Sequence, residues 1–152
     1  MDDVRLRLDE VGGFALEDLT VGMTACYART VTEADITLFA GLSGDVNPVH
    51  VNEIYATGTQ FKGRIVHGML SASFLSTAIA NRLPGPGSIY VSQNLRFKAP
   101  VRIGDTVEAR ITVTDIIPDR RRVMLKTVCS VGGKVVIDGE AEVLLPPRPR
   151  AC

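Results

Sequence analysis

The chain holds two imidazoles, His50 and His67, and an imidazole is the side chain best suited to proton transfer near neutral pH. The carboxyl group of Asp45 precedes His50 by five residues. A carboxylate and an imidazole that meet at one water molecule can activate that water by general acid–base catalysis. These residue types and their spacing make the segment over residues 45–67 the first candidate for a catalytic site.

Asp45 and His50 meet only if the chain reverses direction between them. On a helix their side chains would lie about 140° apart around the axis, and in an extended strand roughly 17 Å apart. Pro48 disfavours a helix interior here, whereas Gly44 and the Asn47-Pro48 pair favour a sharp turn. The segment therefore predicts a loop that brings Asp45 and His50 together, although an aspartate in such a turn also commonly caps backbone N–H groups.

A second chemical feature is the expected start of a helix at His67 and Gly68. The free N–H groups at a helix N-terminus, with the helix dipole behind them, stabilise negative charge, and glycine lets a ligand approach them closely. Gly68 could thus support an oxyanion, or it could equally serve tight helix packing. Further along this helix, the Ser76 hydroxyl would by default bond to a carbonyl of the preceding turn.

The elements that must position these groups follow from the hydrophobic pattern. Apolar and polar residues alternate over 89–97 and over 106–117, which is typical of strands with one buried and one exposed face. Two further strands are expected over 121–131 and 134–145, joined by a hairpin at Gly132-Gly133, and a shorter strand is expected near residues 23–31. Short turns between consecutive strands favour an antiparallel sheet.

The first half of the chain carries the helical signals. The stretch from Thr32 to Asp35 has the form of a capping box that opens a helix. The segment over 67–83 is apolar on nearly all sides, without a charged residue between His67 and Asn81, and such a helix is typically buried. We therefore expect an α+β domain in which an antiparallel sheet wraps one long central helix, and a homodimer that relieves the exposed sheet edges.

Composition and charge exclude several classes of function. The 152 residues fit one domain, with its core over about residues 20–146 between a frayed N-terminal lead-in and a frayed C-terminal tail. Lys plus Arg and Asp plus Glu both number 17, so the charge does not favour nucleic-acid binding. Because no apolar run could span a membrane and the N-terminus lacks a secretion signal, we expect a cytoplasmic protein. The three cysteines lack metal-ligand spacing, so no metal is expected.

A longer stretch of sequence carries a resemblance to a known family. Residues 39–50, followed by Ala56, resemble the hydratase-2 motif of the MaoC-like (R)-specific enoyl-CoA hydratases, and the likeness continues through 65–69, 84–90 and 95–100. It covers nearly the whole chain. The likeness is greatest to the short, single-domain bacterial hydratases that supply polyhydroxyalkanoate synthesis.

The resemblance implies a hot-dog fold and a homodimer whose acyl tunnel lies near the subunit interface. It assigns the catalytic pair to Asp45 and His50 and the N–H group that supports the thioester oxygen to Gly68. It also implies an assisting hydroxyl at Ser76. Seven further residues are candidates for substrate binding, the last four through the phosphates of coenzyme A: Asn47, His67, Met69, Lys62, Arg64, Arg96 and Lys98. Solvated surface charge is the default role of the four cations.

The activity implied is the reversible syn hydration of a trans-2-enoyl-CoA to a (3R)-hydroxyacyl-CoA, with coenzyme A as part of the substrate and no metal or redox cofactor. Three alternatives stay open: a 3-hydroxyacyl-acyl-carrier-protein dehydratase, a hot-dog acyl-CoA thioesterase and a non-catalytic acyl-CoA-binding subunit. Residues 68–80 contain no Asp or Glu, which counts against a thioesterase with a carboxylate on its central helix. The presence of both Asp45 and His50 counts against a non-catalytic subunit.

Overall fold

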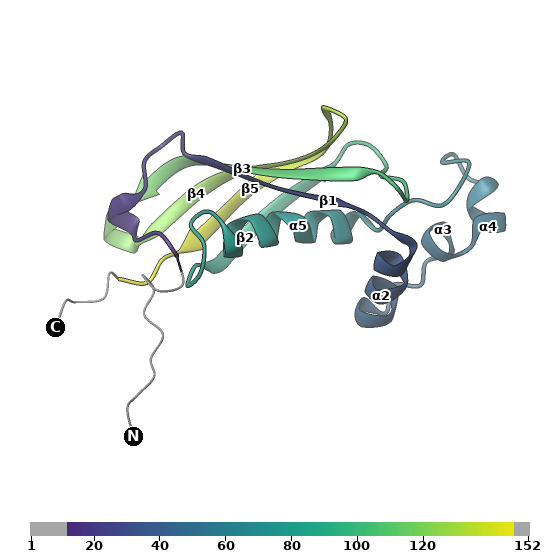
Figure 1. The fold of residues 1–152 in the computed structure, drawn as a ribbon, viewed down its shortest axis with the longest axis horizontal. Coiled ribbons are helices and arrows are strands. Elements are labelled where there is room, and N and C mark those ends of the chain that lie inside the picture. The colour runs from purple at the N-terminus through teal and green to yellow at the C-terminus, as the bar shows by residue number, and fades with distance from the viewer. Residues whose placement is uncertain (1–11, 148–152) are drawn as a thin grey trace, which may run out of the picture.

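A computed structural model describes residues 12–147 of the chain as one sheet folded over a central helix (Figure 1). The elements in chain order are η1 (Leu16–Asp18), β1 (Thr24–Thr30), α2 (Glu33–Ser43), α3 (Pro48–Val51), α4 (Glu53–Thr57), α5 (Gly68–Asn81), β2 (Ile89–Phe97), β3 (Thr106–Ile117), η2 (Pro118–Arg120), β4 (Arg122–Val131) and β5 (Lys134–Leu144). The expected lead-in as far as residue 11 and the tail from residue 148 lie outside the described residues. Within residues 12–147, no helix is long and apolar enough to cross a membrane.

The five strands pair antiparallel in the order β1-β3-β4-β5-β2. Buried and more exposed side chains alternate along β3 from Val107 to Val113, and β4 repeats this alternation from Val123 to Cys129. The buried set packs with α5 in one hydrophobic core, as the period of two predicts. The expectation of an α+β fold with an antiparallel sheet wrapped around one long helix is thereby confirmed (Figure 1).

Helix α5 packs one side against the sheet and leaves the other side open. Seven of its 14 residues are buried: Leu70, Ser71, Ala72, Phe74, Leu75, Ala78 and Ile79. Met69, Ser73 and Ala80 are exposed, and their spacings of four and seven residues place them on one side of the helix. The expected burial of this helix is therefore confirmed on the side that faces the sheet, whereas its outer side stays exposed in the single chain described over residues 12–147.

Between β1 and α5 the chain forms three helices at one end of the molecule (Figure 1). Thr32 opens α2 with the expected capping box, since its Oγ1 accepts the Asp35 N–H group and the Asp35 carboxylate accepts the Thr32 N–H group. The helix ends at Gly44, whose φ of +77° costs a glycine little. Asn47 then caps α3 through its side-chain oxygen. These caps fix the segment that carries the candidate catalytic residues.

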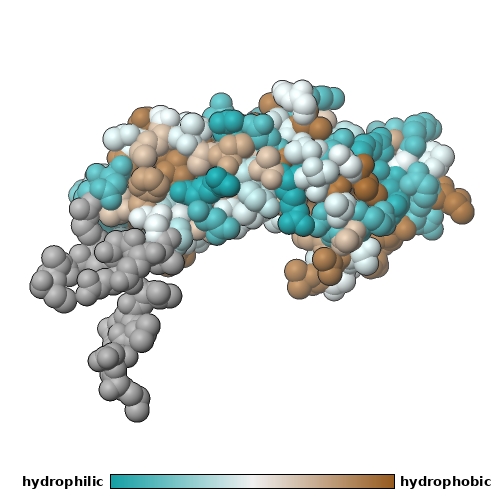
Figure 2. Space-filling model, viewed as in Figure 1, coloured by the Kyte–Doolittle hydropathy of each residue, from teal (hydrophilic) through white to brown (hydrophobic). Residues whose placement is uncertain are grey.

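Exposed apolar side chains gather at two places. One is the helical end of the molecule, where Figure 2 shows apolar surface and where Leu38, Leu42 and Ile54 are 70–90% exposed. The other is the edge strand β2, on which Ile89 and Val91 are exposed. An edge strand also presents unpaired backbone groups. Both places are candidate contact surfaces, because a monomeric protein rarely exposes large contiguous apolar patches.

Candidate active site

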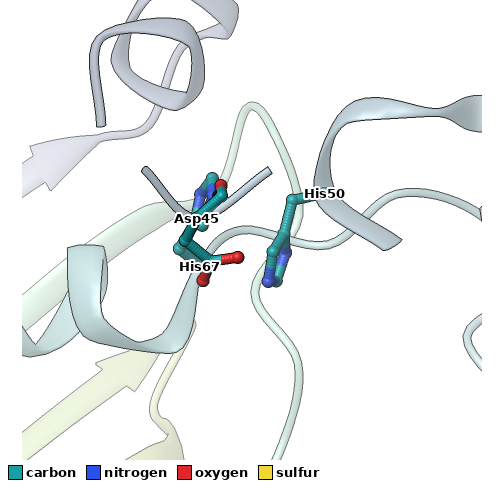
Figure 3. Close-up of side chains that lie close together, drawn as sticks. All are labelled: Asp45, His50 and His67. Carbon is teal, nitrogen blue, oxygen red and sulfur yellow. Dashed lines mark hydrogen bonds between the residues drawn. The ribbon is translucent and has the colours of Figure 1, made fainter. Parts of the chain in front are cut away.

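The turn predicted between Asp45 and His50 is present and takes the form of a short helix. Asp45 follows the left-handed Gly44 that ends α2, and Pro48 occupies the first position of α3. Proline is favoured there because its missing N–H group would have no intrahelical acceptor. The turn of α3 carries His50 back toward Asp45, and one side-chain ligand atom from each of Asp45, His50 and His67 lies within 4.8 Å of the others (Figure 3). The structure thus brings the two groups together, as the turn signals predict.

A hydrogen bond fixes the orientation of the His50 ring. His50 is 8% exposed, and its Nδ1 lies 2.8 Å from the backbone carbonyl oxygen of Ile65. A carbonyl oxygen only accepts, so Nδ1 of the neutral ring carries the proton and donates it, and Nε2 keeps a lone pair. His50 can therefore accept a hydrogen bond from water while the chain holds its ring in place.

His67 links the two segments that form the site. It is 1% exposed, and its Nε2 donates to the backbone carbonyl oxygen of Asp45 at 2.9 Å. Its ring stacks on that of His50, with the centroids 4.0 Å apart, and contacts the ring of Phe39 at 4.9 Å. The remaining Nδ1 is buried and finds no hydrogen-bond partner among the described residues. These contacts place His67 where it can hold Asp45 and His50 in position, and its predicted contact with the substrate stays a prediction.

A pocket of about 450 Å³ opens beside Asp45. Its wall is formed by the segment before α5, the first turn of α5, and residues of β2, β5 and the 98–101 segment. The lining residues are Asp45, Phe61, Ile65, Val66, Gly68, Met69, Ser71, Phe97, Lys98, Ala99, Pro100, Val101 and Ile137. A mainly apolar pocket with one carboxylate at its edge suits an apolar ligand that carries a polar reacting group.

Gly68 lies in this lining as the first residue of α5, with the ring of Phe97 against it. A Cβ atom at position 68 would come within 2.7 Å of Phe97 Cε1, closer than side-chain atoms approach. The N–H groups of Leu70 and Ser71 bond to the His67 carbonyl, whereas the first N–H groups of a helix have no acceptor within it. The two interpretations of Gly68, tight packing and an available N–H donor, are therefore compatible.

The separation of Asp45 and His50 suits a shared water molecule. Hydrogen bonds to water are about 2.8 Å long, so one water molecule can bridge two atoms up to roughly 5.6 Å apart. The carboxylate of Asp45 and the nearer ring nitrogen of His50 lie within 4.8 Å of each other, and one carboxylate oxygen also accepts the Asn47 N–H group at 3.2 Å. The pair can therefore hold and polarise a single water molecule.

The same three side chains are also the group in residues 12–147 that comes close enough together to hold a metal ion. A tetrahedral metal needs lone pairs that converge on one point at about 2.0–2.1 Å from each imidazole nitrogen. The planes of the His50 and His67 rings are only 29° apart and stacked, so their in-plane lone pairs run side by side instead of converging. This geometry suits a bridging water better than a metal ion.

The other predicted site residues differ in their placement. Met69 lines the pocket, whereas the side chain of Asn47 is engaged as the cap of α3. Ser76 is half-buried, about 12 Å along α5 from its first residue, and lies outside the pocket lining that residues 12–147 form. Lys62 and Arg96 are exposed and also lie outside that lining. The roles of these five residues stay predictions.

Two of the four predicted cations are held by acidic partners. Arg64 contacts Glu33 at 2.8 Å and Glu53 at 3.3 Å, and its hydrogen bond lowers the pKa of the Glu33 carboxyl group. Lys98 lies in the pocket lining and contacts Asp138 at 2.5 Å. Arg64 therefore ties α2 to α4, and its Nη1 also donates to the backbone carbonyl oxygen of His50 at 3.5 Å. Lys98 is the predicted cation that lies in the pocket lining formed by residues 12–147.

Sequence reasoning missed two residues that shape the pocket. Arg102 donates to three backbone carbonyls in the loop over 61–64 and so fixes one wall. Ser71 lines the pocket with a buried hydroxyl group that has no hydrogen-bond partner in the described part of the chain. The spacing of three residues between Gly68 and Ser71 indicates a shared helix face, so this signal was available. Nothing local in the sequence marks Arg102.

A five-stranded antiparallel sheet wrapped around one central helix, with the helix start beside the site, defines a protein of the hot-dog fold. The solved structure of the unliganded R-hydratase PhaJ1 from Pseudomonas aeruginosa shares this fold, with a TM-score of 0.83 and 46% identity over 89% of this chain and 87% of that chain. The chain belongs to the MaoC-like domain family, which residues 20–134 match.

Two curated relatives are similar over most of their length. The (R)-specific enoyl-CoA hydratase of Rhodospirillum rubrum is 60% identical over 132 residues, which cover 87% of this chain and 92% of the relative. The 3-hydroxybutyryl-CoA dehydratase of Methylorubrum extorquens is 46% identical over 144 residues, which cover 95% of this chain and 92% of the relative. The family membership expected from the sequence is thus confirmed.

Proposed function

We propose that the protein is an (R)-specific enoyl-CoA hydratase, a hydro-lyase that adds water reversibly and syn to a trans-2-enoyl-CoA. The observation that carries this proposal is the meeting of the Asp45 carboxylate and the His50 imidazole, within 4.8 Å, at an apolar pocket. Two relatives support the same chemistry, one named as an (R)-specific enoyl-CoA hydratase and one as a 3-hydroxybutyryl-CoA dehydratase. Hydration of an enoyl-CoA and dehydration of a 3-hydroxyacyl-CoA are the two directions of one reaction.

In the proposed reaction, one water molecule lies between Asp45 and His50. It donates one hydrogen to the Asp45 carboxylate and the other to Nε2 of His50, whose Nδ1 is engaged by Ile65. As the water oxygen bonds to C3 of the substrate, Asp45 takes up its proton as a general base. The π electrons of the C2–C3 bond shift toward the thioester carbonyl, and an enolate forms.

The N–H group of Gly68 would donate to the thioester oxygen as this negative charge develops. One such donor contributes about 10²–10³ to the rate in other enzymes. The enolate collapses when C2 takes up a proton from the Asp45–His50 pair on the face from which water was added. That return of the proton makes the addition syn, restores the pair and gives a (3R)-hydroxyacyl-CoA. The sequence of steps requires neither a metal nor a redox cofactor.

The proposed substrate contacts follow the pocket outward from the reacting atoms. The acyl chain would occupy the apolar interior, and Met69 would contact the thioester arm at the edge of the pocket. Lys62, Arg96 and Lys98 remain candidates for the coenzyme A phosphates, since each is exposed. Arg64 is the weakest of the four predicted cations for this role, because two carboxylates already hold its guanidinium group.

A homodimer is also part of the proposal. The exposed apolar residues of edge strand β2 and the open side of α5 are surfaces that a second copy would cover. Ser76 lies near the open side of α5, between the positions of Met69 and Ala80, so an assisting role for its hydroxyl would require the dimer. We place the enzyme in the cytoplasm, where it would supply (3R)-hydroxyacyl-CoA for polyhydroxyalkanoate synthesis.

The alternatives receive less support. Relatives named as 3-hydroxyacyl-acyl-carrier-protein dehydratases, from Solanum lycopersicum and Arabidopsis thaliana, are 39% and 36% identical, below the two relatives named for coenzyme A thioesters. A thioesterase with its carboxylate on the central helix is disfavoured, because α5 contains no Asp or Glu. A non-catalytic subunit would leave the convergence of Asp45 and His50 unexplained.

The test is the incubation of the purified protein with crotonyl-CoA. We expect loss of the conjugated enoyl absorbance and formation of (3R)-3-hydroxybutyryl-CoA, identified by chiral analysis. A parallel reaction uses crotonyl-acyl carrier protein, and a thiol reagent reports any free coenzyme A. Unchanged absorbance would contradict the proposal, faster turnover of the carrier-protein thioester would favour the dehydratase, and release of thiol would favour the thioesterase.

A further inference from the structure

The Arg102 side chain donates its hydrogen bonds to the backbone of one loop. Its Nη1 donates to the carbonyl oxygens of Gly63 at 3.0 Å and of Arg64 at 3.2 Å, and its Nη2 donates to that of Phe61. Among the described residues, no carboxylate forms an ion pair with this guanidinium group. Hydrogen bonds from a charged donor are stronger than those between neutral groups. The positive charge of Arg102 therefore serves to hold the loop over 61–64.

The turn that carries Arg102 is itself fixed by the fold. The Arg102 N–H group donates to the Asp105 carboxylate at 2.8 Å, and the Asp105 N–H group donates to the Arg102 carbonyl at 3.0 Å. Gly104 and Asp105 also bond to the backbone of Val31, which is completely buried just before α2. The guanidinium group therefore extends from a base whose position does not depend on the loop.

The peptide group between Arg64 and Ile65 connects this base to α3. Its carbonyl accepts from Arg102 at 3.2 Å, and its N–H group donates to the carbonyl oxygen of Val49 at 3.2 Å. Val49 belongs to α3, the short helix that also carries His50. A peptide group is planar, so a rotation of its carbonyl also turns its N–H group. Loss of the bond from Arg102 would therefore disturb the bond to α3 as well.

The next peptide group, between Ile65 and Val66, holds the His50 ring. Its carbonyl accepts from Nδ1 of His50 at 2.8 Å, and its N–H group donates to the carbonyl oxygen of Val101 at 2.8 Å. Two successive peptide groups are thus bonded to α3 on one side and to residues 101 and 102 on the other. The direction of the Ile65 carbonyl, and with it the orientation of the His50 ring, depends on these four hydrogen bonds.

We propose that Arg102 is a positioning residue for the hydration reaction and acts on His50 through the Ile65 carbonyl. This inference rests on the proposed hydratase function and adds a residue outside the pocket lining that residues 12–147 form. Without Arg102, the loop carbonyls would turn toward water and the Ile65 carbonyl would lose its direction. The His50 ring would then rotate away from the water molecule that it shares with Asp45. A misplacement of about 1 Å can lower a rate by about 10².

Steady-state kinetics of the full-length protein with crotonyl-CoA distinguish this role from the shaping of a pocket wall. Arg102→Met keeps a long side chain without a donor, and it should lower kcat about 10–100-fold with little change in KM. Arg120→Met is the matched control, because Arg120 is exposed in η2, and it should leave both constants unchanged. A higher KM at unchanged kcat in Arg102→Met would overturn the proposal, since the loop would then only shape the pocket.

Nuclear magnetic resonance of protein that contains ¹⁵N-labelled histidine tests the ring directly. The chain has two histidines, and each donates a ring hydrogen to a backbone carbonyl, so the wild type should show two slowly exchanging ring N–H signals. His67→Gln assigns them. In Arg102→Met, the signal of His50 should shift or disappear through exchange with water. The signal of His67, which bonds to the Asp45 carbonyl, should persist as the internal control.

Arg102→Gln covers the case in which Arg102→Met does not fold. Its single neutral amide group cannot replace the three bonds of the guanidinium group, so it should change the His50 signal and kcat in the same direction. An unchanged His50 signal in a folded variant would overturn the inference. A wild type inactive on crotonyl-CoA would instead contradict the hydratase function, and the histidine signals would still decide whether Arg102 holds the ring.

Discussion

The imidazole rings of His50 and His67 lie stacked, with their centroids 4.0 Å apart and an angle of 29° between their planes. The same His67 ring donates its Nε2 hydrogen to the backbone carbonyl oxygen of Asp45. One buried side chain therefore contacts both members of the proposed catalytic pair, one through its ring and the other through its backbone. The separation of the carboxylate and the imidazole consequently depends on a residue that need not touch the substrate.

Two substitutions of His67 distinguish the effect of its hydrogen bond to Asp45 from the effect of the space that its ring fills. His67→Gln retains an N–H donor near the position of Nε2, whereas His67→Leu fills the space without a donor. We expect His67→Leu to lower kcat about 10–100-fold with little change in KM, because a small displacement of reacting groups is costly, and His67→Gln to recover most of that loss. Steady-state kinetics with crotonyl-CoA would measure both. Near-normal kcat in His67→Leu would show that Asp45 holds its position unaided.

Asp45 and His50 themselves can be tested with conservative replacements. Asp45→Asn removes the base, and His50→Gln removes the imidazole lone pair that accepts from water, so each should lower kcat by at least about 10². Asp119→Asn is the matched control, since this aspartate is exposed in η2. Thermal unfolding and gel filtration should be unchanged in all three variants. A folded variant of either residue with nearly full activity would refute the role proposed for that residue.

The turn that joins Asp45 and His50 could be predicted from the sequence because its signals are local. Gly44 ends one helix, and Asn47 and Pro48 begin the next, within a single short segment. Pro48 disfavours a helix interior, and it occupies the first position of α3, where proline is favoured, so the short helix that follows it was not predicted. The fold class was predictable for a similar reason, since the period-two pattern of each strand is a property of that strand alone.

The rest of the site depends on contacts between distant segments, which no local pattern shows. Phe97 reaches Gly68 from another element, and Arg102 reaches the backbone of the loop over 61–64 from beyond β2. The ion pairs of the predicted cations also join distant segments, because the acidic partners of Arg64 come from two separate helices. Composition could suggest that such cations exist, but only the folded chain shows which of them are already paired.

Gly68 and Phe97 provide a prediction that tests close packing at the helix start. Gly68→Ala would place a Cβ atom 2.7 Å from Phe97 Cε1. Phe97 is 53% exposed, so its ring can shift, and we expect the variant to stay folded while kcat/KM for crotonyl-CoA falls by about tenfold or more through the displaced N–H donor.

The double variant is the informative comparison at this position. Phe97→Leu in the Gly68→Ala background makes room for the added methyl group and should recover part of the lost activity, whereas Phe97→Leu alone should have a smaller effect. Kinetics of the three variants would measure this coupling. Independent effects of the two substitutions would show that the ring contact does not position the helix start.

The capping box of α2 predicts a dependence of stability on pH. Asp35 is 9% exposed, and the hydrogen bond from the Thr32 backbone N–H lowers the pKa of its carboxyl group, aided by the Thr32 hydroxyl and by Arg29 at 2.6 Å. Because the folded state binds this proton less readily than the unfolded state, the contribution of Asp35 is fully present above its ordinary pKa, near 4. It is lost as the pH falls through the lowered pKa of the folded state.

Asp35→Asn should therefore destabilise the protein by about 1 kcal/mol near pH 7, the usual contribution of a capping interaction, and the difference from the wild type should shrink toward pH 3. Thermal unfolding at both pH values would measure the effect, with Asp119→Asn as the exposed control. A difference that stayed constant or grew as the pH fell would contradict the assignment. Because α2 ends at Gly44, directly before Asp45, the same variant should also lose crotonyl-CoA hydration at a lower temperature than the wild type.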